Sequence, residues 1–394
     1  MLTQPPGLDR LVILVPTLLQ AAFFFALGAS VASFVNVIAW RWPRGQGIVN
    51  PPSRCSTCGR SLQWWENIPI LSWIALRGRC RSCGVRIGCS HVLVELGVAA
   101  LFAATVVLLY GGPFTERAAP DATWWTRLGA WETAPALLAV LSLWGCLIAA
   151  SLIDAETGYI PLGITSLAMG VGLVAMTAQG CMTRATDPFL LPGWPTGFLT
   201  PMWVGVGLGG LIGVASAAVL LWKNWLPRSF ATIDPIEEVA ASVARKEVMK
   251  EFLFLALPLV GCIAGGWLFR DAALPAPLAA LGASALGLLV GAATIWLTRI
   301  FGTLAFGREA MGLGDVHLMA AAGCVIGWRD SLITYLLAPF LALIWVLISG
   351  GLAKMRGKTA RELPYGPHLA LACMIVFLLR PWVVPITSTL FGLP

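Results

Sequence analysis

Two aspartates, Asp154 and Asp315, lie at the ends of separate apolar stretches. A carboxylate beside lipid is costly unless it is paired, hydrated or protonated, so each is a candidate functional group. Two carboxyl groups within about 3 Å of each other cannot both ionise, because one proton is shared between them. The ionised group can then activate a water molecule while the other protonates a leaving amine. The pair therefore predicts acid/base hydrolysis of a peptide bond, provided that the fold brings the two residues together.

The composition requires a membrane environment. Of the 394 residues, 58% are hydrophobic and 11% are charged, which is more apolar surface than a globular core can bury. About 20 apolar residues cross the hydrocarbon region as a helix. The predicted fold is therefore all-α, a polytopic transmembrane helical bundle with a small loop domain. The expected spans are 11–39, 91–111, 133–153, 160–178, 201–222, 252–270, 275–298, 330–350 and 367–390, and a shorter apolar segment is 316–328.

The basic residues predict the orientation of these spans. If the N-terminus lies outside and 316–328 counts as a crossing, most of the 26 Lys and Arg residues fall in inside loops, as the positive-inside rule requires. Asp154 and Asp315 then both lie at the cytoplasmic face. The net charge of +7 follows from this topology and from attraction to membrane lipids. It does not indicate nucleic-acid binding, because the basic residues are scattered over several loops.

Four cysteines form two C-x-x-C pairs, Cys55 with Cys58 and Cys80 with Cys83. Residues 59–79 separate the pairs, which is close to the spacing with which two knuckles share one tetrahedral zinc ion. Disulfides or redox dithiols are the alternative, but the predicted cytoplasmic location favours a metal. Because four sulfur ligands leave no position for water, such a zinc ion is expected to be structural.

The chain is expected to divide into five segments. They are the first span (1–40), a cytoplasmic zinc-binding loop domain (41–90), spans carrying Asp154 (91–178), an enlarged middle region (179–300) and C-terminal spans carrying a Gly-x-Gly-Asp motif (301–394).

Two further patterns in the middle region predict local structure. An aspartate, a proline and a glutamate at 234–237 are typical of a helix start, so 223–251 is expected to be a cytoplasmic amphipathic insertion leading into the next span. Glycines at four-residue spacing, Gly205, Gly209 and Gly213, predict close helix packing.

Taken together, these motifs resemble those of the type IV prepilin peptidase family, the bacterial inner-membrane aspartic proteases. The resemblance covers roughly residues 26–105, 145–175 and 305–372, and the middle matches nothing recognisable. Six motifs carry the resemblance. The first three are the segment 32–38, the cysteine loop with its segments 67–73 and 77–83, and the segment 93–96. The other three are Asp154 with Ile160-Pro161, the segment 309–315 and the segment 363–367.

The resemblance implies that the protein cleaves the short basic leader of prepilins or pseudopilins at the cytoplasmic face, with Asp154 and Asp315 as catalytic residues. In many members it also implies N-methylation of the new terminus with S-adenosylmethionine. The chain departs from the family pattern at 88–92, beside the cysteine loop that the family associates with methylation, and at His317. A peptidase without methyltransferase activity therefore remains an alternative.

Two other classes of protein remain open. A proton-coupled transporter would use the aspartates as relay sites, but it would need ionisable groups deep in the spans, whereas the charges here cluster at the ends. A zinc-ribbon scaffold would recruit partners to the membrane and use the aspartates only as helix caps. Cleavage that depends on both carboxyl groups distinguishes the protease from either rival.

Overall fold

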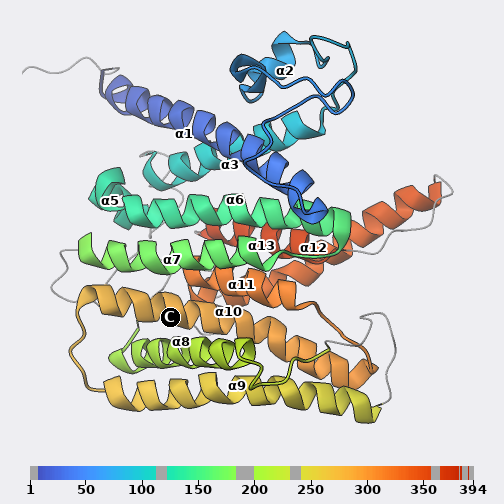
Figure 1. The fold of residues 1–394 in the computed structure, drawn as a ribbon. Coiled ribbons are helices and arrows are strands. Elements are labelled where there is room, and N and C mark those ends of the chain that lie inside the picture. Colours follow the sequence, from blue (N-terminus) through green and yellow to red (C-terminus); the bar gives the residue numbers. More distant parts are fainter. Residues whose placement is uncertain are drawn as a thin grey trace, which may run out of the picture. The chain divides into compact units, whose positions relative to one another are not determined.

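The computed structural model describes residues 8–111, 122–182, 199–230, 241–355 and 364–380, together with 382, 383 and 389. These residues form helices and no strand, which confirms the predicted all-α class (Figure 1). The elements are α1 (Leu8–Arg41), η1 (Trp42–Arg44), η2 (Trp64–Asn67), α2 (Leu71–Ala75), α3 (Ser90–Tyr110), α5 (Ala122–Glu132), α6 (Ala134–Thr157), α7 (Leu162–Met182), α8 (Pro201–Trp222), α9 (Ala241–Phe269), α10 (Ala276–Phe306), α11 (Leu313–Ile326), α12 (Trp328–Met355) and α13 (Gly366–Leu378).

Eight of the described helices are long and apolar enough to cross a membrane, so the protein is a multi-pass membrane protein. They coincide with the expected spans from 11–39 to 330–350. Two further apolar helices, α11 and α13, are shorter. The expected span 367–390 is thus described as a helix of only 13 residues, Gly366–Leu378, and most of the chain after it lies outside the described residues.

The chain folds as two compact units, one ending at Gly129 and the other beginning at Ala130. In the first unit α1 packs against α3, and a loop of residues 42–89 connects them. The contact is close because Gly28 has no side chain: a Cβ atom there would lie 2.9 Å from the Cα atom of Ala99. The absence of that atom lets the two helices approach backbone to backbone.

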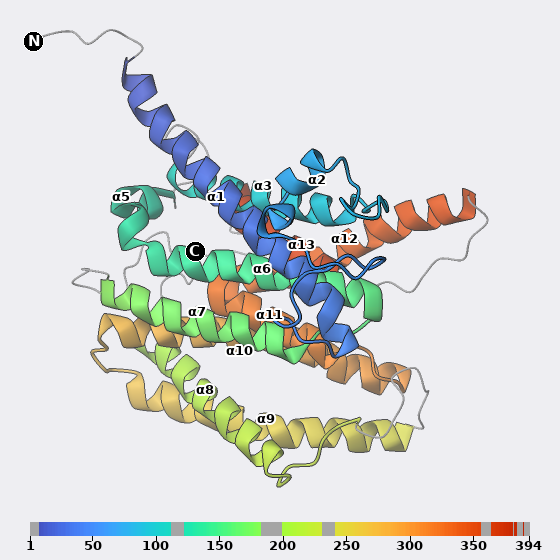
Figure 2. The same cartoon turned by 45° about the horizontal axis from the view of Figure 1, so that its top comes forward.

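The second unit is a bundle in which α10 packs against α7, α8, α11 and α12. Helices α6, α7, α10 and α11 lie side by side in both views (Figures 1 and 2), and α13 packs on α6, α11 and α12. This arrangement places segments from both ends of the unit around α11, the helix that carries Asp315.

Helices α8 and α9 form a tightly packed pair on the other side of α10. A Cβ atom at Gly205 would lie 2.3 Å from the carbonyl oxygen of Gly265, and one at Gly209 would lie 2.0 Å from that of Gly261. The close packing predicted from these glycines is therefore confirmed. The predicted helix start at 234–237 lies outside the described residues, and α9 runs unbroken from Ala241 to Phe269.

Several helix ends meet at one end of the second unit, on the right of Figure 1. Helices α6 and α10 end there, and α7, α9, α11 and α13 begin there. Asp154 is near the end of α6 and Asp315 is near the start of α11. The topology thus brings both aspartates to the same end of the bundle.

Candidate active site

Asp154 lies in the last turn of α6 with its side chain buried, only 7% exposed. The helix ends at Gly158, whose φ of 68° is a left-handed conformation that glycine adopts without strain. The carboxylate oxygen Oδ2 of Asp154 accepts a hydrogen bond of 3.0 Å from the backbone N–H of Gly366, the first residue of α13. This bond joins two segments that are 212 residues apart in the sequence.

Asp315 is half-buried in the first turn of α11. The helix begins after Gly312, whose extended backbone turns the chain into the helix. Asp154 lies close enough to Asp315 for the two carboxyl groups to interact electrostatically. The two carboxyl groups are thus within electrostatic range of each other, and their role as an acid/base pair stays a prediction.

Ile160 holds the three segments of this site together. Its side chain is buried against two glycines: a Cβ atom at Gly314 would lie 2.8 Å from the Cβ atom of Ile160, and one at Gly366 would lie 3.0 Å from its Cδ1 atom. Neither neighbour can carry a side chain in this arrangement. The glycines therefore let the ends of α6, α11 and α13 converge around the carboxyl groups.

The structure adds three residues that sequence reasoning did not assign to the site. Gly366 donates a hydrogen bond to Asp154. His368 lies within electrostatic range of Asp154, and its Nδ1 atom is 3.0 Å from the carbonyl oxygen of Pro364. Tyr365 lies within electrostatic range of Asp315. The only signal in the sequence was the family motif at 363–367, which carries no chemistry of its own.

This geometry can support hydrolysis by two carboxyl groups. Asp154 accepts a hydrogen bond from a backbone N–H, and the half-buried Asp315 lies within electrostatic range of it. One carboxylate and one carboxylic acid at the edge of an apolar bundle are the groups that general base and general acid catalysis need.

The four cysteines of the first unit form a cluster in which all Sγ atoms lie within 4.8 Å of one another. A tetrahedral zinc ion with Zn–S bonds of about 2.3 Å places its sulfur ligands roughly 3.8 Å apart. The Sγ atoms of Cys55 and Cys83 are 3.8 Å apart. The cluster Cys55, Cys58, Cys80 and Cys83 could therefore hold one metal ion.

The backbone around both C-x-x-C pairs is shaped in the same way. Gly59 and Gly84, which follow the pairs, have φ values of 69° and 68° and donate hydrogen bonds to the carbonyl oxygens of Cys55 and Cys80. Backbone N–H groups of Cys58 and Thr57 lower the pKa of the Cys55 thiol to about 6, and equivalent groups lower the pKa of Cys80. The thiolate is the metal-binding form of cysteine. The backbone N–H groups of the turns therefore favour the form of Cys55 and Cys80 that binds a metal ion.

Ion pairs and hydrogen bonds support the loop around this cluster. Arg60 contacts both Glu66 and Ser82, and so connects the two knuckles. Glu95 of α3 accepts a hydrogen bond of 2.7 Å from the backbone N–H of Ile70, at the start of α2. The loop is thereby attached to a membrane-spanning helix through a buried carboxylate.

Comparison with protein families gives two matches. Residues 26–109 match the Bacterial Peptidase A24 N-terminal domain, and residues 244–347 match the Type IV leader peptidase family. The second match contains Asp315 but not Asp154. Asp154 is related to the matched region through Asp315, which lies within electrostatic range of it.

The chain is also similar to curated proteins. It is 41% identical over 182 residues to a prepilin leader peptidase/N-methyltransferase of Myxococcus xanthus, covering 46% of this chain and 47% of the relative. It is 26% identical over 380 residues to a protein of the same name from Burkholderia pseudomallei, covering 90% and 84%. A type 4 prepilin-like proteins leader peptide-processing enzyme of Escherichia coli is 31% identical over 170 residues, covering 39% and 55%. No solved structure matches the chain.

Proposed function

Because this chain belongs to the type IV prepilin leader peptidase family, we propose that Asp154 and Asp315 are the catalytic pair with which it removes the leader of type IV prepilins or pseudopilins. The observation that carries this proposal is the convergence of the ends of α6, α11 and α13 on the two carboxyl groups. The proposal assigns a role to both aspartates and to the glycines beside them.

In the proposed reaction Asp154 acts as the general base. The hydrogen bond from Gly366 favours its carboxylate form, which takes a proton from a water molecule. The water oxygen attacks the carbonyl carbon of the scissile peptide bond, and protonated Asp315 donates its proton to the leaving nitrogen as the C–N bond breaks. The products are the carboxylic acid end of the leader and the amine end of the mature chain, which become a carboxylate and an ammonium group when the acid gives its proton to the amine. Transfer of one proton from Asp154 to Asp315 restores the starting state.

We place this site at the cytoplasmic face of the bacterial inner membrane. The support is the distribution of basic residues, which puts the ends of the spans that carry Asp154 and Asp315 on the positively charged side. A basic leader would remain in the cytoplasm, while the apolar N-terminal helix of the substrate would lie in the bilayer.

Mass spectrometry of pilin N-termini tests the proposed function. We expect the leader to be removed in cells that contain this protein and retained in cells that lack it. The same spectra report whether the new terminus carries a methyl group, and so distinguish a peptidase/methyltransferase that uses S-adenosylmethionine from a peptidase alone. An uncleaved prepilin in the presence of the protein would contradict the function.

The cysteine cluster is proposed to hold one structural zinc ion through Cys55, Cys58, Cys80 and Cys83. The distances between the sulfur atoms support this assignment. The ion would neutralise the thiolates and tie the two knuckles together, and it would leave no position for a reacting water.

Elemental analysis of the purified protein tests this site. We expect about one zinc ion per chain in the wild type. The double variant C55S/C58S should lose the metal, because two hydroxyl groups cannot replace two thiolates. The matched control is C89S, since Cys89 is exposed and outside the cluster. A double variant that retains its zinc would contradict the assignment.

A further inference from the structure

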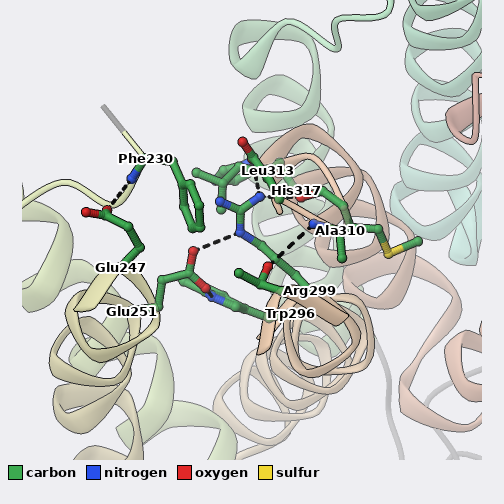
Figure 3. Close-up of polar contacts among 11 residues, drawn as sticks. Phe230, Glu247, Glu251, Trp296, Arg299, Ala310, Leu313 and His317 are labelled. Atoms are coloured by element: carbon green, nitrogen blue, oxygen red, sulfur yellow. Dashed lines mark hydrogen bonds and ion pairs between the residues drawn. The ribbon is translucent and has the colours of Figure 1, made fainter. Parts of the chain in front are cut away.

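The segment that precedes Asp315 is held by a buried arginine of α10. Arg299 (Figure 3) is 1% exposed. Its Nη1 atom contacts both the carboxylate of Glu309 and the backbone carbonyl oxygen of Met311. Both contacts fall on the short connection between α10 and α11. Since α11 begins at Leu313, Arg299 binds the chain directly before the helical turn that carries Asp315.

The other side of this arginine is bound by α9. The Nε atom of Arg299 donates a hydrogen bond of 2.8 Å to Oε1 of Glu251. The second oxygen of Glu251 accepts a hydrogen bond of 2.9 Å from the indole Nε1 of Trp296, and the ring of Phe230 covers the guanidinium group at 5.1 Å. Figure 3 shows the bond from Arg299 to Glu251. The same arginine also pairs with Glu309, so it joins two different segments of the chain.

Burial makes this arrangement rigid. The side chains of Arg299 and Glu251 are 1% and 2% exposed, so neither charge can exchange its partner for water without a large cost. A planar guanidinium group also fixes the direction of each bond that it donates. A displacement of Glu251 on α9 would therefore be passed to Met311 through Arg299.

In the part of the chain that the structure describes, no side chain caps the start of α11. Its N-cap residue is Gly312, which has no side chain to bind the first backbone N–H groups. Gly314 also lacks a side chain, because Ile160 occupies that space. The position of the first turn of α11, and with it the carboxyl group of Asp315, depends on contacts made from outside the turn.

We propose that Arg299 is a positioning residue for Asp315 and that Glu251 of α9 is its anchor, so that the α8–α9 pair of the middle region supports the active site. This inference rests on the proposed peptidase function. Arg299 acts through the backbone of the Glu309–Met311 segment and not on the substrate. The middle region thereby helps to hold Asp315 in position for the reaction.

The test compares variants of the full-length enzyme with a purified prepilin in proteoliposomes. The central variant is R299M/E251M, which removes both buried charges together and so avoids an unpaired one. We expect its thermal unfolding midpoint and its KM to stay near those of the wild type, and its kcat to fall roughly 10- to 100-fold, because a displacement of about 1 Å at a reacting group has an effect of that size. Glu309, which is partly exposed, can then be hydrated.

Two single variants keep the test decisive if the double variant is unstable. E251Q retains the shape of the anchor but loses its charge, and R299K retains the charge but loses the planar set of donors. Both are expected to lower kcat several-fold without raising KM, with R299K retaining more activity than R299M. The matched control is K250Q, because Lys250 pairs with Glu247 on α9 itself and does not reach the α10–α11 connection.

The outcomes separate this inference from the proposed function. Cleavage by the wild type in the same assay, together with its loss in an Asp154 variant, establishes the peptidase independently. A kcat of R299M/E251M or of E251Q equal to that of K250Q would overturn the positioning role alone. A change confined to KM would overturn it as well, because it would assign Arg299 to substrate binding.

Discussion

Replacing Asp154 or Asp315 with asparagine is expected to lower the rate of prepilin cleavage by about 1,000-fold or more. An amide has nearly the shape of a carboxyl group, so the packing of α6 and α11 should be preserved, but it can neither take a proton from water nor donate one to the leaving amine. The measurement is the single-turnover cleavage rate of a purified prepilin by each variant in proteoliposomes.

The matched control is D271N. Asp271 is highly exposed, and it forms an ion pair with Arg270 between α9 and α10, at the end of these helices opposite to the aspartate pair. Its loss should leave the cleavage rate unchanged. Substantial cleavage by either D154N or D315N would rule out the carboxyl pair and would favour one of the rival classes, in which the aspartates are relay sites or helix caps.

Replacing Gly366 with alanine is expected to lower kcat/KM roughly 100-fold. The added methyl group would lie 2.7 Å from Oδ2 of Asp154, which is closer than such atoms approach, and 3.0 Å from Cδ1 of Ile160, which is a tight contact. Since the shorter of the two contacts is with Asp154, we expect the carboxyl group of Asp154 to move. The backbone N–H of residue 366 is retained, so the substitution tests the space around Asp154 and not the loss of a donor.

A glycine elsewhere in the same unit provides the control for G366A. A Cβ atom at Gly170 of α7 would meet nothing within 4 Å, so G170A should be as active as the wild type and at least as stable, because alanine favours a helix more than glycine does. The comparison uses kcat/KM and the thermal unfolding midpoint of both variants. Equal activity of G366A and G170A would contradict the close contact between Gly366 and Asp154.

The inserted pair α8 and α9 explains why the two aspartates are so far apart in the sequence. It lies between α7 and α10 in the chain and packs mainly on itself and on α10. Helix α10 therefore keeps its contacts with α7 and α11, and the ends of α6 and α11 can still meet. The separation of Asp154 from Asp315 along the chain places no constraint on their separation in space.

Residue types and their spacing were enough to predict the class of protein, most of the spans, the two candidate carboxyl groups and the four cysteines. Each of these depends on residue type and local spacing. A run of apolar residues indicates a bilayer span, and a carboxylate at the end of a span indicates a functional group. Two C-x-x-C pairs predict a shared metal ion. The zinc ligands and the catalytic roles stay predictions until the experiments above are done.

Which helix ends meet is seen only in the folded protein. The hydrogen bond from Gly366 to Asp154, the position of Ile160 between two glycines, and the bond from Arg299 to Glu251 join segments from different helices. Hydropathy shows that a helix is buried in lipid or protein, but not which neighbour it packs against, because every apolar face satisfies that requirement equally well. The partners are selected by shape and by directional hydrogen bonds, and these exist only after the helices have assembled.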